Sequence, residues 1–286
     1  MAVLDACGLD SWSWALRRFH TPVSANALVL EVGSGGNPYP RSNVLLDAYE
    51  ATRERHWVPL TADRPTVLGF VENLPFRDRA FDFVIASHVL EHSPHPERFI
   101  AELERVAASG YIEVPDAFLE RVNPYRDHRL EITCRDETLI IMKKRSWVHD
   151  PEVVELYEDR VKQFLTSELI PRRPYEFHVR HYWANRIAYR VINPEVDAAW
   201  DPPAQVRPEP TASWAGRARE FVRVALRDML SQRERNRSID LLPLLRCTDC
   251  HASSLLSEAS RLVCTTCGST FERRNGLFVM NEAVKT

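Results

Sequence analysis

Five short apolar runs predict β-strands in the first part of the chain, at residues 28–32, 43–47, 66–69, 81–86 and 111–114. Between the last two runs, residues 96–109 place Phe99, Ile100 and Leu103 on one face of a helix. Strands that alternate with helices are typical of a parallel, doubly wound sheet. The pattern therefore predicts an α/β fold, in which the short connection after the first strand leaves room for little or no helix.

The segments before and after this pattern predict further elements. Residues 9–20 carry apolar side chains at helical intervals and predict a packing helix. Residues 130–142 predict a strand pair with a turn near Asp136. Residues 193–210 are rich in proline and predict a linker or an extended brace. Residues 215–237 predict a helix with a basic end.

The first apolar run ends in a glycine-rich turn, where we expect function to lie. Its members are Gly33, Ser34, Gly35 and Gly36. Glycine permits a positive φ and a close approach of backbone N–H groups to a ligand. Pro38 and Pro40 follow at once and no Gly-Lys-Ser/Thr is present, which disfavours a dinucleotide or a triphosphate.

A carboxylate ends the second predicted strand. Asp47 would lie beside the glycine turn, where it could accept hydrogen bonds from both hydroxyls of a ribose. The alternative is an aspartate that caps a helix or a turn. We favour the ligand role because the glycine turn is its neighbour.

These motifs, in this order, resemble the class I S-adenosylmethionine (SAM)-dependent methyltransferases, and specifically the type 11 group that includes quinone-biosynthesis enzymes. The resemblance covers roughly residues 27–115 and rests on EVGSGGN, Asp47, ENLPF, FDFVIASHVLEH, a helix ending in ELERV, and GYIEVP. It implies a Rossmann-like fold whose sheet is closed by a hairpin. Insertions near that hairpin commonly form a lid over the methyl acceptor.

The resemblance also implies a set of cofactor contacts. The methionine end of SAM would lie against the turn and its flanking residues, Glu31, Gly33, Ser34, Gly35, Gly36 and Asn37. Asp47 would bind the ribose, the segment Val71, Glu72, Asn73 and Leu74 would cover the adenine, and Ser87 and His88 would line the cofactor near its sulfonium. Two residues depart from the pattern: Asn37 replaces the third glycine, and Phe70 replaces an acidic residue, for which stacking by Phe70 or a contact from Glu72 could substitute.

A general base is needed only if the acceptor must lose a proton, because the sulfonium leaves as a neutral group. His88 and His92 follow the fourth predicted strand, where a histidine is more often packed than catalytic. The cluster Tyr125, Asp127, His128 and Arg129 precedes the predicted hairpin, and a solvated loop is the commoner reading of such a cluster. If a base is used, we expect it to be His128.

Charge and composition bear on nucleic-acid binding and on the expected cellular location. A formal net charge of −3 gives no general attraction to nucleic acid. Residues 177–193 are both aromatic and basic, which could serve RNA binding, although an amphipathic element is the commoner case. No long apolar run and no signal peptide are evident in the sequence, so we expect a cytoplasmic protein with no membrane span.

Four cysteines predict a second, smaller structure. Two Cys-x2-Cys pairs, Cys247 with Cys250 and Cys264 with Cys267, are typical of a structural four-cysteine zinc site. Residues 241–280 resemble the small zinc-ribbon proteins that activate tRNA and translation-factor methyltransferases by packing on them. We therefore expect a methyltransferase domain with an acceptor-side insertion at residues 1–193, a linker and amphipathic helix at 194–238, and a zinc ribbon at 239–286 that packs in cis.

Our sequence-based hypothesis is methyl transfer from SAM to a small-molecule or glycan-type acceptor. The missing Asn/Asp-Pro-Pro-Tyr/Phe and Pro-Cys motifs argue against methylation of an exocyclic base nitrogen and of pyrimidine carbon 5. The alternatives are an RNA methyltransferase and a SAM-binding scaffold without turnover. The acceptor and any partner protein stay unidentified at this stage.

Overall fold

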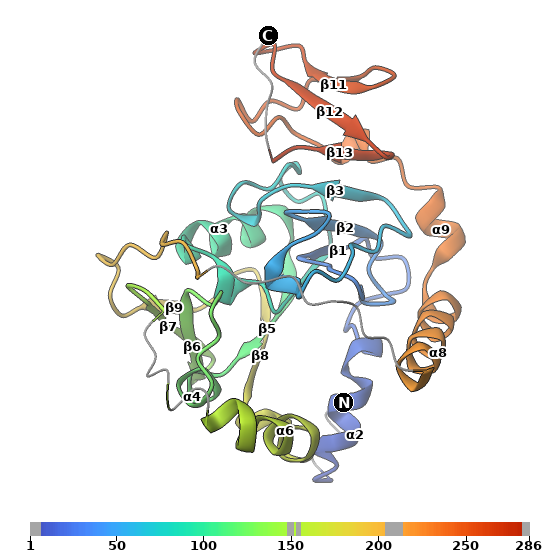
Figure 1. Cartoon of the computed structure of the whole chain (residues 1–286). Coiled ribbons are helices and arrows are strands. Elements are labelled where there is room, and N and C mark those ends of the chain that lie inside the picture. The colour runs from blue at the N-terminus through green and yellow to red at the C-terminus, as the bar shows by residue number, and fades with distance from the viewer. Residues whose placement is uncertain (1–6, 148–151, 153–155, 204–213, 282–286) are drawn as a thin grey trace. The chain divides into compact units, whose positions relative to one another are not determined.

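The computed structural model describes residues 7–147, 152, 156–203 and 214–281 (Figure 1). The chain forms two compact units. Unit 1 comprises Met1–Pro22, Ala86–Glu97 and Tyr111–Ala204, and unit 2 comprises Val23–Ile85, Arg98–Gly110 and Gln205–Thr286. The chain passes from one unit to the other within β4 (Phe83–Ser87), α3 (Pro96–Val106) and β5 (Ser109–Pro115).

Unit 2 is built on a parallel sheet. Strands β1 (Val29–Val32), β2 (Val44–Asp47) and β3 (Thr66–Leu68) pair in parallel, with Leu30 opposite Val44 and Leu45 opposite Thr66. Every residue of the three strands is buried, as expected for a sheet covered on both faces. The parallel order confirms the α/β class, and β1 joins β2 without an intervening helix, as the short connection predicts.

The C-terminal segment extends the same sheet. Strand β13 (Leu277–Val279) pairs in parallel with β3, Phe278 lying opposite Val67. Strands β10 (Leu255–Ser257), β11 (Arg261–Cys264) and β12 (Thr270–Arg274) follow in antiparallel order, which gives the sequence β10-β11-β12-β13-β3-β2-β1 in unit 2 (Figure 1).

Besides most of α3, the described part of unit 2 contains η2 (Arg53–Arg55), η3 (Val71–Asn73), α8 (Trp214–Leu230), α9 (Arg233–Arg237) and η8 (Leu242–Leu244). Helices α8 and α9 replace the single helix that we expected over residues 215–237. Gln232 leaves helical geometry, with φ −80° and ψ 58°, and its side-chain oxygen accepts a hydrogen bond from Asn43 at 3.0 Å. Gln232 thus lies at the break between α8 and α9, where its side chain is bonded to Asn43.

Unit 1 contains a separate three-stranded sheet. Strands β6 (Leu130–Arg135) and β7 (Thr138–Lys143) form the predicted hairpin, and Asp136 and Glu137 adopt φ values of 48° and 56°, as a two-residue hairpin turn requires. Strand β9 (Tyr189–Val191) pairs with β7 in parallel. The implied closure of the main sheet by this hairpin is therefore wrong, because β6 and β7 pair with β9 instead.

The other elements of unit 1 are the strand β8 (His178–Ala184), the neighbour of β5, and a set of helices. The helices are α2 (Asp10–Leu16), η1 (Arg17–Phe19), η4 (Leu90–His92), α4 (Ala117–Val122), η5 (Tyr157–Val161), α6 (Lys162–Phe164), η6 (Leu165–Leu169), α7 (Ile170–Arg172) and η7 (Pro174–Glu176). Among the described residues, no helix combines the length and the apolarity that crossing a membrane requires.

The predicted domain boundaries near residues 193 and 238 stay a prediction. Part of the predicted linker, residues 204–210, and the last residues of the predicted ribbon lie outside the described residues. The predicted helix over residues 9–20 is present as α2 and η1.

Candidate functional site

The glycine turn uses its glycines for two different reasons. Gly33 and Gly35 have φ values of 62° and 60°, in the left-handed region that favours glycine. Gly36 is needed for space, because a Cβ there would lie 2.4 Å from Val58 Cγ1. Asn37, which stands where the family pattern has a third glycine, is half-buried. The turn is thus a tight structure with residue 58 packed against it.

Ser34 supplies an observation that fits a ligand at this turn. Its hydroxyl is buried and has no hydrogen-bond partner among the described residues. A buried polar atom without a partner costs free energy unless a ligand or water satisfies it. The methionine end of SAM carries a carboxylate and an ammonium group, either of which could bond to that hydroxyl. The turn therefore fits the cofactor that the sequence predicts.

Asp47 lies beside the turn, as predicted. It is 5% exposed, and its Oδ2 accepts a hydrogen bond from the Gly35 N–H at 2.9 Å. Its Oδ1 accepts hydrogen bonds from the Tyr49 N–H at 3.2 Å and from Arg55 Nη1 at 2.5 Å. Arg55 was not among the predicted site residues, and no motif marks it. A ribose that binds Asp47 would share this carboxylate with Arg55 or displace it.

Glu31 has a structural role in addition to any ligand contact. Its side chain is buried, and Oε2 accepts hydrogen bonds from the Tyr39 N–H at 2.8 Å and the Ser42 hydroxyl at 2.6 Å. The carboxylate thereby holds the segment that follows the turn. Its predicted contact with the methionine end of SAM stays a prediction.

Two exposed aromatic rings lie where the adenine is expected. Phe70 follows β3 and is 38% exposed, and Tyr49 follows β2 and is 45% exposed. Their ring centroids are 5.9 Å apart in an edge-to-face arrangement. Such rings offer a stacking surface to a flat base. The stacking role predicted for Phe70 stays a prediction, and Tyr49, which lies beside that ring, was not among the predicted residues.

Hydrogen bonds from other parts of unit 2 hold the predicted adenine segment, residues 71–74, in place. Val71 and Leu74 are buried, and the Leu74 N–H donates to Glu102 Oε2 at 2.6 Å. The Asn73 side chain donates to the Thr248 carbonyl at 2.9 Å, which belongs to the cysteine-bearing segment. Glu72 is half-buried in η3. The position of this segment thus depends on the C-terminal part of unit 2.

Ser87 and His88 lie in unit 1 at the end of β4, around a buried carboxylate. Glu113 is fully buried on β5. It accepts hydrogen bonds from Arg17 Nε at 2.8 Å, the Tyr111 hydroxyl at 2.5 Å and the Ser87 hydroxyl at 3.3 Å, and His88 Nε2 lies 3.3 Å from Oε1. The sequence does contain a signal for this residue, a lone charge within the apolar run GYIEVP.

Charge stabilises the ionised form of this carboxylate. Burial alone would raise the pKa of Glu113, but His88 and Arg17 hold that pKa well below its usual range. For His88, burial lowers the pKa, whereas the carboxylates of Glu113 and Glu91 outweigh it and raise the pKa to about 9. His88 also has a φ of 56°, which is costly for a residue with a Cβ. The predicted contact of Ser87 and His88 with the cofactor stays a prediction.

His128 does not lie in a solvated loop. It is 7% exposed, and its Nδ1 lies 2.6 Å from Glu120 Oε2 in a hydrogen bond. Asp127 is also buried, so the solvated-loop alternative is wrong for these two residues. His128 is held by a carboxylate, as catalytic and metal-binding histidines often are.

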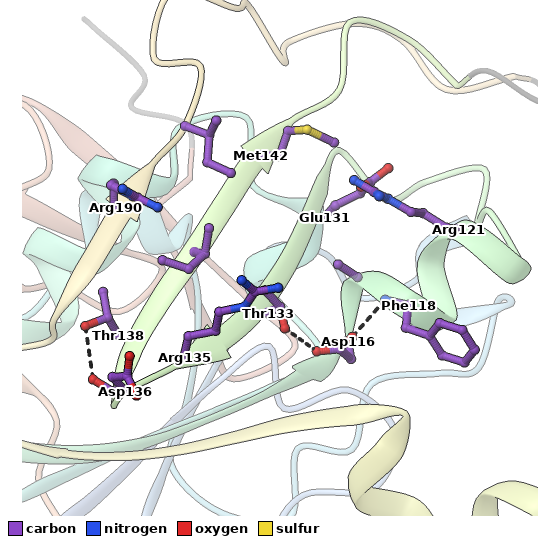
Figure 2. A pocket seen from close by; sticks show the side chains of 13 residues that line it. Asp116, Phe118, Arg121, Glu131, Thr133, Arg135, Asp136, Thr138, Met142 and Arg190 are labelled. Atoms are coloured by element: carbon purple, nitrogen blue, oxygen red, sulfur yellow. Dashed lines mark hydrogen bonds and ion pairs between the residues drawn. The ribbon is translucent and has the colours of Figure 1, made fainter.

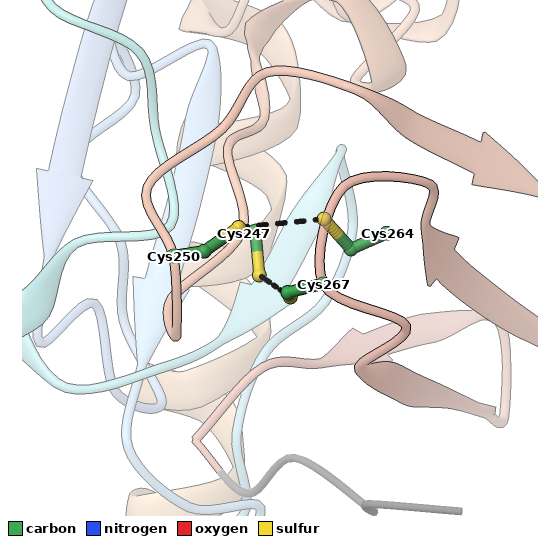
Figure 3. Close-up of side chains that lie close together, drawn as sticks. All are labelled: Cys247, Cys250, Cys264 and Cys267. Atoms are coloured by element: carbon green, nitrogen blue, oxygen red, sulfur yellow. Dashed lines mark hydrogen bonds between the residues drawn. The ribbon is translucent and has the colours of Figure 1, made fainter.

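The four predicted cysteines come together in unit 2 (Figure 3). All four have free thiols, and their sulfur atoms lie within 4.8 Å of one another. The Cys247–Cys267 and Cys250–Cys264 sulfur distances are 3.7 and 3.5 Å. A tetrahedral zinc ion with Zn–S bonds of about 2.3 Å separates its sulfurs by about 3.8 Å. The cluster therefore fits a structural zinc ion.

Side chains connect the cysteine-bearing segment to the rest of unit 2. The Arg246 guanidinium lies 3.1 Å from Glu102, whose carboxylate also holds the adenine segment. Arg77 donates to the carbonyls of Leu245 and Ser253 at 3.0 and 2.8 Å. Together with the pairing of β13 and β3, these contacts make the segment an integral part of the unit.

A pocket of about 760 Å³ lies over one face of the three-stranded sheet in unit 1 (Figure 2). Phe118, Ile140 and Met142 supply apolar surface, and Arg135 and Arg190 supply positive charge. Arg121, also in the lining, is paired with Glu131 at 2.8 Å. The pocket offers one concave surface with apolar, cationic and acidic groups, the last from Asp116, Glu131 and Asp136.

Comparisons with known proteins agree with the predicted class. Residues 41–112 match the family model described as "Methyltransferase domain". A segment of 43 residues is 46% identical to ajmaline N-methyltransferase of Rauvolfia serpentina, and it covers 15% of this chain and 15% of that enzyme. Residues 41–112 therefore resemble a methyltransferase domain, in agreement with the class that the sequence predicts, while the matched segment spans only 15% of the curated relative's length.

Solved structures also show partial similarity. A chain from the complex of the Haloferax volcanii Trm112 methyltransferase activator with a proposed methyltransferase is 18% identical, with 47% of this chain and 77% of that chain covered and a TM-score of 0.31. The YcgJ protein of Bacillus subtilis is 17% identical, with 54% and 82% covered and a TM-score of 0.32.

Proposed function

We propose that this protein transfers the methyl group of SAM to a small-molecule or glycan-type acceptor, and that a zinc ion in the four-cysteine cluster braces the cofactor-binding unit. One observation carries the cofactor assignment. Asp47 ends β2, bonds to the N–H of Gly35, and lies beside the exposed rings of Tyr49 and Phe70. A carboxylate for ribose, a tight glycine turn and a stacking surface are the three parts that an adenosine-containing cofactor needs.

Calorimetric binding of SAM and S-adenosylhomocysteine tests this assignment. We expect Asp47→Ala to weaken binding by more than tenfold, a loss of about 1.4 kcal/mol or more. Asp47→Asn, which keeps the shape and can still accept the Gly35 hydrogen bond, should weaken binding less. Asp201→Ala, at an exposed position in unit 1, serves as the control and should bind as the wild type does. Folded wild-type protein that binds neither compound would refute the cofactor assignment.

The pocket in unit 1 supports a small acceptor. Its volume of about 760 Å³ is within the range of about 300–1,000 Å³ that small-molecule sites occupy. Phe118 and Met142 suit the apolar part of an organic molecule, and Arg135 and Arg190 suit an anionic or hydroxyl-bearing part. We infer that the acceptor combines both kinds of surface.

Labelled SAM distinguishes the acceptor classes. The protein is incubated with labelled SAM and either a small-molecule fraction or an RNA fraction of a cell extract. We expect label in the small-molecule fraction, and a loss of that labelling in the Arg135→Gln/Arg190→Gln double variant with SAM binding unchanged. Arg172→Gln, at an exposed position in unit 1, is the matched control. Label in RNA alone, with the steep salt dependence of phosphate contacts, would establish the RNA alternative instead.

The proposed zinc ion is tested by metal analysis of the purified protein. We expect Cys264→Ser to abolish stoichiometric zinc in this cluster and to lower the thermal stability of unit 2, because four thiolates hold a structural zinc ion together. Cys134→Ser, which removes a thiol in unit 1, is the control and should retain the ion. Full retention of zinc by Cys264→Ser would refute the assignment.

A further inference from the structure

A second group of metal-ligating side chains lies in unit 1. Glu91 and His92 belong to the short helix η4, which follows β4, and His128 lies just before β6. One ligand atom from each of the three residues lies within 4.8 Å of the others. Two segments that are separated in the sequence thus bring two imidazoles and one carboxylate to one place.

The carboxylate of Glu91 is buried and has no hydrogen bond among the described residues, although His88 lies beside one of its oxygens. Glu91 is 2% exposed, and neither carboxylate oxygen makes a hydrogen bond among the described residues. The Nδ1 atom of His88 is 3.4 Å from Oε1, close enough for attraction but without a hydrogen bond. Buried charges in proteins are paired, hydrogen-bonded or bound to metal ions. His88 supplies one positive charge near Oε1, and because neither oxygen is hydrogen-bonded, the Glu91 carboxylate can bind a further cation.

Both imidazoles are oriented as metal ligands usually are. His128 Nδ1 bonds to Glu120 Oε2 at 2.6 Å, and His92 Nδ1 lies 3.1 Å from the Asp127 carbonyl oxygen. For His128, the Glu120 carboxylate, which only accepts hydrogen bonds, fixes the proton of a neutral imidazole on Nδ1 and leaves the lone pair on Nε2. Metal-binding histidines characteristically donate their other N–H to a carboxylate or a backbone carbonyl.

The carboxylate behind His128 is itself held in place. Glu120 Oε1 accepts hydrogen bonds from Lys144 Nζ at 2.6 Å and from the Tyr125 N–H at 3.1 Å. The ring planes of His92 and His128 are 89° apart at a centroid distance of 4.7 Å, so the rings meet edge to face rather than stacked. These contacts fix the orientation of the His128 ring, as a metal ligand requires.

We propose that Glu91, His92 and His128 bind a divalent transition-metal ion. Two imidazoles with one carboxylate is a donor set that suits ions from Mn²⁺ to Zn²⁺, whereas Mg²⁺ and Ca²⁺ prefer oxygen ligands alone. Three protein ligands leave at least one coordination position for water or an oxygen of a bound molecule. This site differs from the four-cysteine cluster, whose four thiolates fill a tetrahedral ion.

The proposal changes the role of His128. A nitrogen that donates its lone pair to a metal ion is not available to accept a proton, so His128 as a ligand cannot be the general base. Any activation of an oxygen would instead come from the metal ion, which lowers the pKa of a coordinated hydroxyl or water. The metal site does not depend on the proposed methyl transfer and can be tested without SAM.

Metal counting and cobalt spectroscopy on the full-length protein test the site. The protein is first loaded with zinc at the cysteine cluster and freed of weakly bound ions, and Co²⁺ is then added. We expect one further equivalent of Co²⁺ with weak d–d absorption and no thiolate-to-cobalt charge-transfer band. Glu91→Gln and His128→Asn should each weaken Co²⁺ binding by more than tenfold and retain the cysteine-bound zinc.

Control variants separate the loss of a metal ligand from a general effect of the substitution on folding. His95→Asn, a histidine change at an exposed position of unit 1, should keep the second equivalent. Retained zinc and an unchanged circular dichroism spectrum show that the ligand variants are folded, and if Glu91→Gln does not fold, His128→Asn and His92→Asn replace it. Zinc-loaded wild type that takes up no Co²⁺, or Co²⁺ binding that survives the ligand substitutions, would overturn the proposal.

Discussion

Asp47 and Arg55 form an ion pair at 2.5 Å, in which the aspartate side chain is 7% and the arginine side chain 15% exposed. The same aspartate is the residue that we expect to bind the ribose of SAM. The guanidinium of Arg55 also donates to the carbonyls of Val58, Tyr49 and Glu50. The ion pair therefore ties the loop over residues 49–58 to the carboxylate at the end of β2.

This arrangement predicts competition for Asp47. Cofactor binding must displace or share the Arg55 hydrogen bond, and a charge-assisted hydrogen bond contributes about 1.5–3 kcal/mol. We expect Arg55→Gln to raise the affinity for SAM several-fold and to lower the melting temperature of the free protein. Calorimetry and thermal unfolding measure the two effects, with Arg53→Gln in the same short helix as control. A weaker affinity in Arg55→Gln would instead make Arg55 a ligand-binding residue.

The buried carboxylate of Glu113 predicts a large loss of stability on neutralisation. Glu113→Gln would remove the buried carboxylate that pairs with Arg17 and, together with Glu91, with His88. Removing one partner of a buried ion pair costs about 3–5 kcal/mol. We expect a loss of this size in the free energy of unfolding, measured with denaturant. Glu97→Gln, whose carboxylate is 38% exposed beside Lys143, should lose less than about 1 kcal/mol. Equal losses in the two variants would contradict the central role of Glu113.

His178 predicts a pH dependence of stability. Burial and the neighbouring positive charge of His88 lower the pKa of His178 to about 4, against about 6.5 in an unfolded chain. The unfolded state binds more protons between these values, so this contribution to stability is complete above pH 6.5 and is lost as the pH falls toward 4. Denaturant unfolding of the wild type and of His178→Gln at several pH values measures it. The variant should show a shallower decline, and an identical decline would disprove the assignment.

Glu120 predicts an indirect effect on metal binding. Glu120→Gln would remove the charged acceptor that orients His128 and leave the three proposed ligands in place. Loss of such a second-layer carboxylate typically weakens metal binding by about 10–100-fold. Co²⁺ titration of the zinc-loaded protein measures this change, with Glu131→Gln as a control in the same unit. Unchanged Co²⁺ affinity would mean that Glu120 only packs against His128.

Removal of zinc predicts weaker cofactor binding. Asn73, in the proposed adenine segment, bonds to the Thr248 carbonyl between Cys247 and Cys250. Disorder of the cysteine cluster would release that segment, so we expect chelation to weaken SAM binding by about tenfold, or about 1.4 kcal/mol. Readdition of zinc should restore the affinity measured by calorimetry. SAM binding that is insensitive to chelation, in protein shown to be zinc-free, would separate the two sites.

Local patterns predicted the features that depend on local sequence. The apolar runs and the glycine turn identified β1, β2 and the position of Asp47, because a buried strand and a tight turn each need particular residues over a short stretch. The Asp136 turn of the β6–β7 hairpin and the two Cys-x2-Cys pairs were predicted for the same reason.

The features that the sequence did not predict depend on contacts between distant residues. Arg55 carries no motif, and only the folded loop brings it to Asp47. From the sequence alone, the polar cluster at His128 is consistent with a solvated loop. Only the folded structure shows that Glu120 forms a hydrogen bond with the His128 ring. The hairpin was predicted, but the pairing of β9 with β7 was not. Pairing between strands that lie far apart in the sequence leaves no local pattern by which to predict it.

The parallel pairing of β3 with β13 has a consequence for folding. Val67 and Phe278 are neighbours in the sheet but lie far apart in the sequence. During synthesis, the edge of β3 must remain unpaired until residues 277–279 have left the ribosome. Contacts over such a long stretch of chain form slowly, and an unpaired strand edge can join the wrong strand in the meantime. Truncation before β13 should therefore cause aggregation of the nascent protein.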